Sequence, residues 1–191
     1  MMKNSITESV LKTELEKAYS KLKMGRYSRF KQVAKYFPNG GRDITVFSGF
    51  EAEWILEEFC SNYINGSYLS CVILCQIMME RALSSFYAMT ERESELFTKG
   101  FKTLIDAAER DNCTTKKSAI QLDKLRQIRN QYNHPYMGLR KSSIMERVGN
   151  GEFKNKTYRN PYMIVKKDAE FSIRLVSNFY KMRSKNRKMD L

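Results

Sequence analysis

The chain has 191 residues, of which 42% are hydrophobic and 12% aromatic, enough to bury the core of one domain. Its net charge of +13 predicts an anionic partner, with nucleic acid as the first candidate. The alternative is a generally basic protein without such a partner. The single histidine excludes a metal site built from several histidines, and the four cysteines lack zinc-finger spacing.

The sequence also predicts a cellular compartment. No signal peptide is visible, which indicates a cytoplasmic protein with reduced cysteines. The longest apolar run, residues 68–79, is interrupted by Ser70 and Gln76 and is too short to cross a bilayer, so we expect no membrane segment. Cys71 and Cys75 stand one helical turn apart in this run, and we expect them to be small core residues.

The N-terminal residues predict a helical hairpin. Residues 5–24 carry an amphipathic helical pattern that Gly25 ends. Ser28 is placed to cap a second helix that reaches Phe37. The apolar stripe of the first helix consists of Ile6, Val10, Leu11, Leu15, Ala18, Tyr19 and Leu22.

The segment Pro38-Asn39-Gly40-Gly41 is the clearest break in the chain. It divides an N-terminal helical extension, residues 1–48, from a main domain, residues 49–191. Residues 43–47 are predicted to form a short extended piece. The extension is either packed on the main domain or serves as a dimerisation arm.

Three helices are predicted next, over residues 49–64, 67–89 and 93–111. The first has an acidic outer face and is ended by Asn65-Gly66, after which Ser67 is placed to cap the second. The second is apolar on almost every side, so we expect it to be the central buried helix.

The most informative stretch is a helix predicted over residues 116–133 and the residues that follow it. Its core-facing stripe consists of Leu122, Leu125, Ile128 and Tyr132. Because Pro135 disfavours a helical backbone at His134, we expect His134 to leave the helix as it ends, where the helix dipole favours the protonated imidazole. Arg129 precedes His134 by five residues. Together they suit RNA cleavage, because the imidazole can move the 2′-hydroxyl proton while the guanidinium binds the phosphate.

The stretch from Arg129 to His134 resembles the Arg-x4–6-His signature of the HEPN superfamily, in which a polar residue usually follows the arginine. The resemblance covers about residues 49–185, as an order of helices. It implies an all-α, up-and-down helical bundle, and many HEPN members are metal-independent endoribonucleases. It assigns Arg129 and His134 as catalytic residues, with Asn130 orienting the site or the phosphate and Asn133 as a weaker candidate of the same kind.

Tyr136 extends the match to Arg-x4-His-x-Tyr. This longer form resembles HEPN toxins whose antitoxin, a minimal nucleotidyltransferase, adenylylates the tyrosine; otherwise Tyr136 is a packing residue. The resemblance implies a toxin or antiviral defence role and a homodimer in which two motifs meet at one composite site. The alternatives are a non-catalytic HEPN module that binds RNA, a nucleotide or a protein partner, and a helical interaction protein in which the motif is a coincidence.

Other residues are candidates for positioning or RNA binding. Glu80 either orients the Arg129 guanidinium by a bidentate bond or forms a solvent-facing pair with Arg81. The basic segment 137–165 forms a small hairpin or a helix over 140–147, and it either guides RNA or is an ordinary surface loop. The candidate RNA-binding cations are Arg126, Arg140, Lys141, Arg147, Lys154, Lys156 and Arg159, and the candidate stacking rings are Phe153, Tyr158 and Tyr162.

The chain is predicted to close with a helix over residues 166–185, followed by a basic tail. Its core-facing residues are Ala169, Ile173, Val176, Phe179 and Tyr180. No Gly-x4-Gly-Lys-Ser/Thr loop and no Gly-x-Gly-x-x-Gly segment occurs in the sequence. We therefore expect neither a cofactor nor a bound metal.

Overall fold

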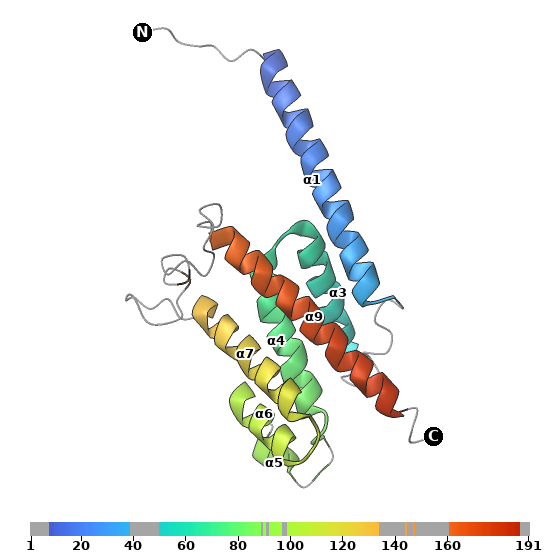
Figure 1. The fold of residues 1–191 in the computed structure, drawn as a ribbon, viewed down its shortest axis with the longest axis vertical. Coiled ribbons are helices and arrows are strands. Elements are labelled where there is room, and N and C mark those ends of the chain that lie inside the picture. The colour runs from blue at the N-terminus through green and yellow to red at the C-terminus, as the bar shows by residue number, and fades with distance from the viewer. Residues whose placement is uncertain are drawn as a thin grey trace.

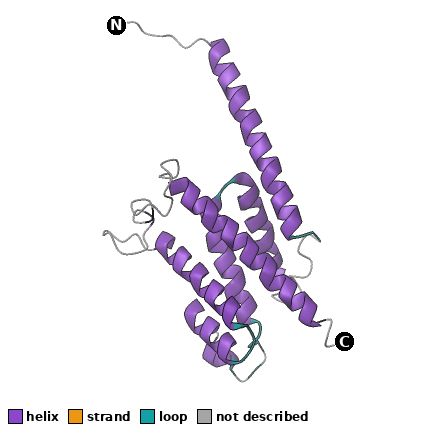
Figure 2. Cartoon of the chain, viewed as in Figure 1, coloured by secondary structure: helices purple, strands orange, loops and turns teal. Residues whose placement is uncertain are grey.

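The computed structural model describes residues 8–38, 50–88, 90, 92–96, 99–133, 144, 147 and 161–187. Over these residues the regular structure is entirely α-helical, and no strand occurs among them (Figure 2). The helices are α1 (Glu8–Tyr36), α3 (Phe50–Asn65), α4 (Tyr68–Ser84), α5 (Glu93–Leu96), α6 (Phe101–Arg110), α7 (Lys116–Asn133) and α9 (Pro161–Arg187). The prediction of an all-α chain is confirmed. No helix in the described ranges is long and apolar enough to span a membrane.

Helix α4 is the central helix, as predicted, and it packs against α3, α6, α7 and α9 (Figure 1). Cys71 and Cys75 are fully buried, which confirms them as small core residues, and Met78 and Met79 are buried beside them. Burial raises the pKa of the Cys71 thiol to about 12, so this thiol stays protonated at neutral pH. The α4 helix ends at Ser84, earlier than the predicted residue 89.

The turn between α3 and α4 follows the predicted glycine signal. Gly66 has a φ of +83°, and its N–H donates to the Tyr63 carbonyl (3.1 Å) while the Ser67 N–H donates to the Asn62 carbonyl (2.8 Å). These two bonds form a Schellman motif, which satisfies carbonyls at the end of α3. Ser67 stands at the N-cap of α4 but makes no side-chain capping bond, so the predicted cap is wrong in that respect.

The predicted N-terminal hairpin is wrong, because α1 runs through Gly25 as one continuous helix of 29 residues. A helical glycine costs only about 1 kcal/mol, and contacts just beyond it hold the helix in place. The Arg26 guanidinium bonds the Asn65 side chain, and Arg29 Nε donates to the Ile64 carbonyl (2.7 Å). From there α1 packs on α3 and α9, whereas its N-terminal half projects beyond the bundle (Figure 1).

The helix predicted over residues 93–111 is in fact two helices, α5 and α6. Gly100 separates them as the N-cap of α6, with an extended backbone (φ −70°, ψ 162°). Both helices are nonetheless anchored in the core, where the buried residues include Leu96, Phe101, Leu104, Ile105 and Ala108. The closing helix α9 begins at Pro161 rather than residue 166, and its predicted core residues are all buried. The predicted extended piece at 43–47 lies outside the described residues.

Candidate functional site

Helix α7 has the predicted bounds, and its core-facing side is the predicted one. Leu122 and Leu125 are fully buried, and Ile128 is nearly so. Thr115 caps the helix by accepting the Ser118 N–H at Oγ1 (3.2 Å). With one side of α7 fixed in the core, the polar residues of its last turns lie either toward α4 and α6 or toward α9.

Arg129 and Asn130 lie in these last turns and are half-buried. Arg129 Nη1 donates to Asn130 Oδ1 at 3.3 Å, so the two predicted site residues are in contact. Asn133 is the last residue given for α7, and its side chain lies outside the described part, as do all of His134 and Tyr136. The arrangement of Arg129 and His134 therefore stays a prediction from sequence.

Glu80 of α4 meets Arg129 of α7 and the start of α6. Its half-buried carboxylate accepts the Phe101 N–H at the N-terminus of α6 and the Gln76 Nε2 (3.4 Å), and the Arg129 guanidinium acts on it electrostatically. Arg81 instead bonds Glu51 (2.8 Å), so the predicted solvent-facing pair of Glu80 and Arg81 is wrong. Burial raises the pKa of Glu80, and the Gln76 bond, the Arg129 charge and the Phe101 N–H only partly offset that rise.

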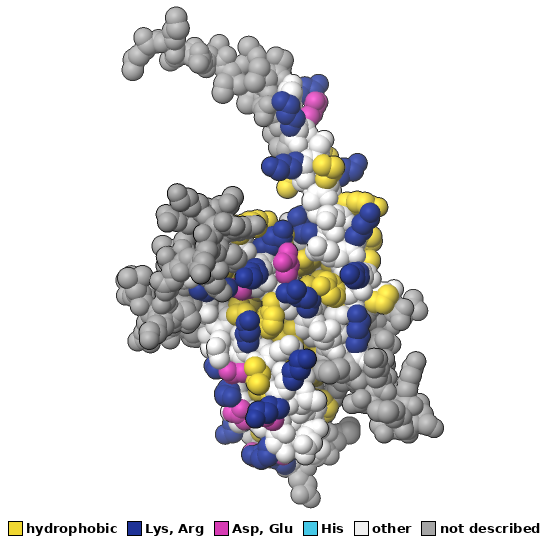
Figure 3. Space-filling model, in the orientation of Figure 1, with side chains coloured by type: hydrophobic (Ala, Val, Ile, Leu, Met, Phe, Trp, Pro, Cys, Tyr) yellow, Lys and Arg dark blue, Asp and Glu magenta, His cyan; other side chains and the backbone are white. Residues whose placement is uncertain are grey.

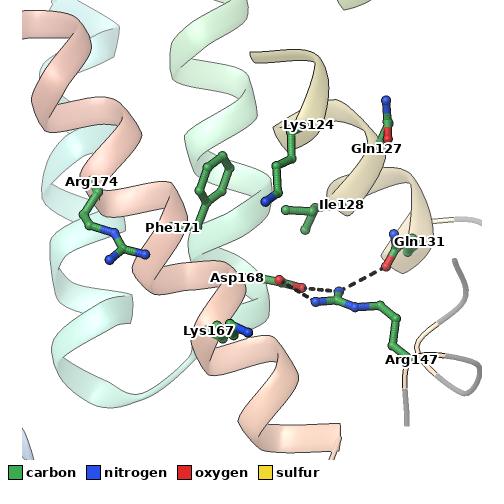
Figure 4. Close-up of a pocket in the computed structure, with 9 residues that line it drawn as sticks. All are labelled: Lys124, Gln127, Ile128, Gln131, Arg147, Lys167, Asp168, Phe171 and Arg174. Carbon is green, nitrogen blue, oxygen red and sulfur yellow. Dashed lines mark hydrogen bonds and ion pairs between the residues drawn. The ribbon is translucent and has the colours of Figure 1, made fainter. Parts of the chain in front are cut away.

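A second polar cluster joins the last turns of α7 to α9 through Asp168. The Arg147 guanidinium donates from Nη1 to Asp168 Oδ2 (2.8 Å) and from Nη2 to Oδ1 (3.0 Å), a bidentate pair that Figure 4 marks with dashed lines. The Tyr132 hydroxyl donates to Asp168 Oδ2 (2.5 Å), and Arg147 Nη1 also donates to Gln131 Oε1 (3.2 Å). Because the Asp168 side chain is only 5% exposed, this is a buried ion pair rather than a surface one.

An open pocket of about 370 Å³ lies between α7 and α9, beside this cluster (Figure 4). Its lining consists of Lys124, Gln127, Ile128, Gln131, Arg147, Lys167, Asp168, Phe171 and Arg174. Among the described residues of the lining, Asp168 is the one carboxylate against four cations, and Arg147 already neutralises it, so this part of the pocket is positively charged. The ammonium of Lys124 lies 5.1 Å from the Phe171 ring centroid. Lys and Arg side chains also spread over the face that carries α9 (Figure 3).

The predicted RNA-binding cations fall into three groups. Arg126 is paired with Asp123 (2.8 Å) on its own helix, and Arg147 is paired with Asp168. The other five lie outside the described residues: Arg140, Lys141, Lys154, Lys156 and Arg159. Tyr162 is half-exposed, and its ring lies 5.4 Å from that of Tyr68.

Sequence reasoning missed the pocket, including Lys124, Lys167 and Arg174. One signal was available, because Asp168 interrupts an apolar stripe of α9, four residues after Ile164 and seven residues before Leu175. An acid at a buried helical position requires a cationic partner. The pattern does not say which of the many basic residues supplies it.

In the described ranges, no group of three or more histidine, cysteine, aspartate or glutamate side chains is placed to hold a metal ion. Comparison with known proteins found no matching family model, no matching curated protein and no matching solved structure. The HEPN resemblance therefore stays a prediction from the sequence.

Proposed function

We propose that this protein is a metal-independent endoribonuclease of the HEPN type, with Arg129 and His134 as its catalytic residues and a toxin or antiviral defence role. The observation that carries the proposal is the sequence from Arg129 to His134 at the C-terminal end of a helix whose other side is buried in the core. The half-buried carboxylate of Glu80 supports it, because a fixed negative charge close to Arg129 restricts where the guanidinium can point.

In the proposed reaction, His134 acts as general base or general acid: it accepts the proton of an RNA 2′-hydroxyl or donates a proton to the leaving 5′-oxygen. The 2′-oxygen attacks the adjacent phosphorus and the bond from phosphorus to the 5′-oxygen breaks, while the leaving oxygen takes up a proton. The products are a 2′,3′-cyclic phosphate and a 5′-hydroxyl. Arg129 stabilises the charge that grows on the non-bridging oxygens, and Asn130, in contact with Arg129, supports its orientation.

The proposal is tested by incubating the full-length protein with total RNA and with tRNA in EDTA, followed by end-group analysis of the products. The wild type should leave cyclic phosphate ends, and His134→Ala and Arg129→Ala should each abolish cleavage. Arg110→Ala is the matched control, because it removes the same charge from an exposed position on α6, where Arg110 pairs with the neighbouring Asp111. Cleavage that persists in both site variants would contradict the assignment.

A second candidate function is a non-catalytic module that binds RNA or a nucleotide. The positively charged pocket between α7 and α9 favours it, because the cations that line the pocket suit phosphate groups and include no histidine. His134→Ala separates the two functions: RNA binding without any cleavage in the wild type or the variant would favour the binding module. Under either function, the remaining partners proposed from the resemblance are an antitoxin such as a minimal nucleotidyltransferase and a second copy of the chain.

A further inference from the structure

The N-terminal half of α1 exposes large apolar side chains away from the bundle. The segment from Glu8 to Gly25 precedes Arg26, whose side chain bonds Asn65 of α3, and it extends for about 27 Å. Within it, Tyr19 is 70% exposed, Leu22 59% and Met24 74%. A helix of this length is marginal in water by itself, and apolar side chains along it favour a packing partner.

The sequence of this segment repeats as a coiled-coil seam does. Leu11, Leu15, Ala18 and Leu22 follow one another at spacings of four, three and four. Continued by the same spacing, the series reaches Arg29, whose side chain bonds the end of α3. The seam therefore lies on the same side of α1 as the residues that pack on the bundle, but nearer the N-terminus.

The charges of α1 select the orientation of a partner helix. All three acidic residues of α1, namely Glu8, Glu14 and Glu16, lie in its first third, and only basic charges follow. If Leu15 packs against Ala18 of a second copy in antiparallel orientation, Glu14 lies beside the partner's Lys21. A parallel pair would instead set Lys21 beside the partner's Arg26, which is repulsive.

We propose that residues 8–25 pair in antiparallel orientation with the same residues of a second copy of this chain. The acidic third argues against an anionic membrane surface as the occupant, because that surface favours an evenly basic helix. The pairing uses no residue of α7, α9 or the pocket. The cleavage assay and the α1 variants therefore test the two proposals separately, because a dimer that forms through another surface would not respond to a change in α1.

The test is sedimentation velocity of the full-length protein over a wide range of concentrations. The wild type should show a concentration-dependent dimer, and Leu22→Lys should raise its dissociation constant by at least about tenfold, since it places a charge in the seam. Leu22 is exposed, so the variant should keep the helical circular dichroism spectrum of the wild type. Lys23→Glu is the control, because it alters an exposed charge outside the seam and should leave the dimer unchanged.

A charge exchange tests the orientation. Lys21→Glu and Glu14→Lys should each weaken the dimer, and the double variant should restore it. The proposal is overturned if the wild type is monomeric at every concentration, if Leu22→Lys dimerises like the wild type, or if the double variant is not restored. A monomer that binds anionic phospholipid vesicles would also overturn it and would assign this face to a membrane.

Discussion

At the scale of single residues, Glu80 connects three helices through one half-buried carboxylate. It lies on α4, accepts the first N–H of α6 and interacts electrostatically with Arg129 on α7. Burial nevertheless dominates, so the pKa of Glu80 is raised in the folded protein. The contribution of this carboxyl to stability is therefore fully present at acid pH and is lost as the pH rises through its folded pKa.

We expect Glu80→Gln to stabilise the protein relative to the wild type as the pH is raised above about 4.5, the ordinary pKa of this side chain. The amide oxygen still accepts the Phe101 N–H, but the cost of burying a charge is gone. Because the group is only half-buried, the relative gain should stay below about 1 kcal/mol. Urea denaturation of both proteins from acid to neutral pH measures it, and a relative stability that falls with rising pH would contradict this account.

Breaking the buried ion pair of Arg147 and Asp168 should change the stability of the protein more than Glu80→Gln does. Arg147→Met should destabilise the protein by about 3 kcal/mol or more, because it leaves the buried Asp168 carboxylate without its cationic partner. Adding Asp168→Asn to that variant should recover part of the loss. Tyr132→Phe removes one hydrogen bond to the same carboxylate and should cost about 1 kcal/mol.

Urea denaturation of these variants gives their free energies of unfolding. The matched control is Arg110→Met, which breaks an exposed pair with Asp111 and should change the stability by less than about 1 kcal/mol. Equal losses for Arg147→Met and Arg110→Met would show that the Asp168 pair is not buried in solution.

At the scale of helices, two glycines in similar sequence contexts have opposite roles. Gly25 lies inside α1, whereas Gly66 ends α3 in the left-handed region. Gly66→Ala should therefore destabilise the protein by about 1 kcal/mol, since a side chain is strained at that φ. Gly25→Ala should be neutral or stabilising by up to about 1 kcal/mol, because the new methyl group meets only the end of the Arg29 side chain, at 3.2 Å.

Thermal unfolding monitored by circular dichroism checks both glycine variants. A melting temperature that falls more for Gly25→Ala than for Gly66→Ala would indicate that α1 is broken at Gly25, as the sequence pattern first suggested. The expected order is a clear fall for Gly66→Ala and no fall for Gly25→Ala.

The helices that were predicted well are those whose signals are local. The bounds of α7 follow from its apolar stripe, Leu122, Leu125, Ile128 and Tyr132, and from Pro135 just beyond it. The break at Gly100 was missed because the carboxylate that receives the first N–H of α6 comes from Glu80, twenty residues away. Gly25 was read as a helix end because a glycine looks alike in sequence whether the chain stops or continues there.

The candidate site likewise has one part that the sequence predicts and one part that it does not. Arg129 and His134 stand out in the sequence because their spacing lies within one short stretch. The pocket does not, because Lys124 and Arg174 come from two helices that are distant in the chain and meet only once α7 and α9 pack together. Periodicity assigns each of these cations to a helix surface, but it does not indicate which surfaces adjoin.

At the scale of the whole molecule, the net charge of +13 predicts RNA affinity that falls steeply with salt. If the pocket contacts phosphates, Lys124→Glu with Arg174→Glu should weaken binding and reduce the slope of log affinity against log salt by about 2. Fluorescence anisotropy of a labelled RNA at several salt concentrations measures the slope. An unchanged slope would exclude the pocket from the RNA interface.

The most direct test of the central claim is the single-turnover cleavage rate of one labelled RNA, measured with its dissociation constant for wild type and His134→Ala. A catalytic His134 predicts that the variant loses at least about a hundredfold in rate while its affinity changes only a few-fold. Equal cleavage rates in the two proteins would contradict a catalytic role for His134. A parallel loss of rate and affinity would contradict it as well, because it would make His134 a binding or structural residue.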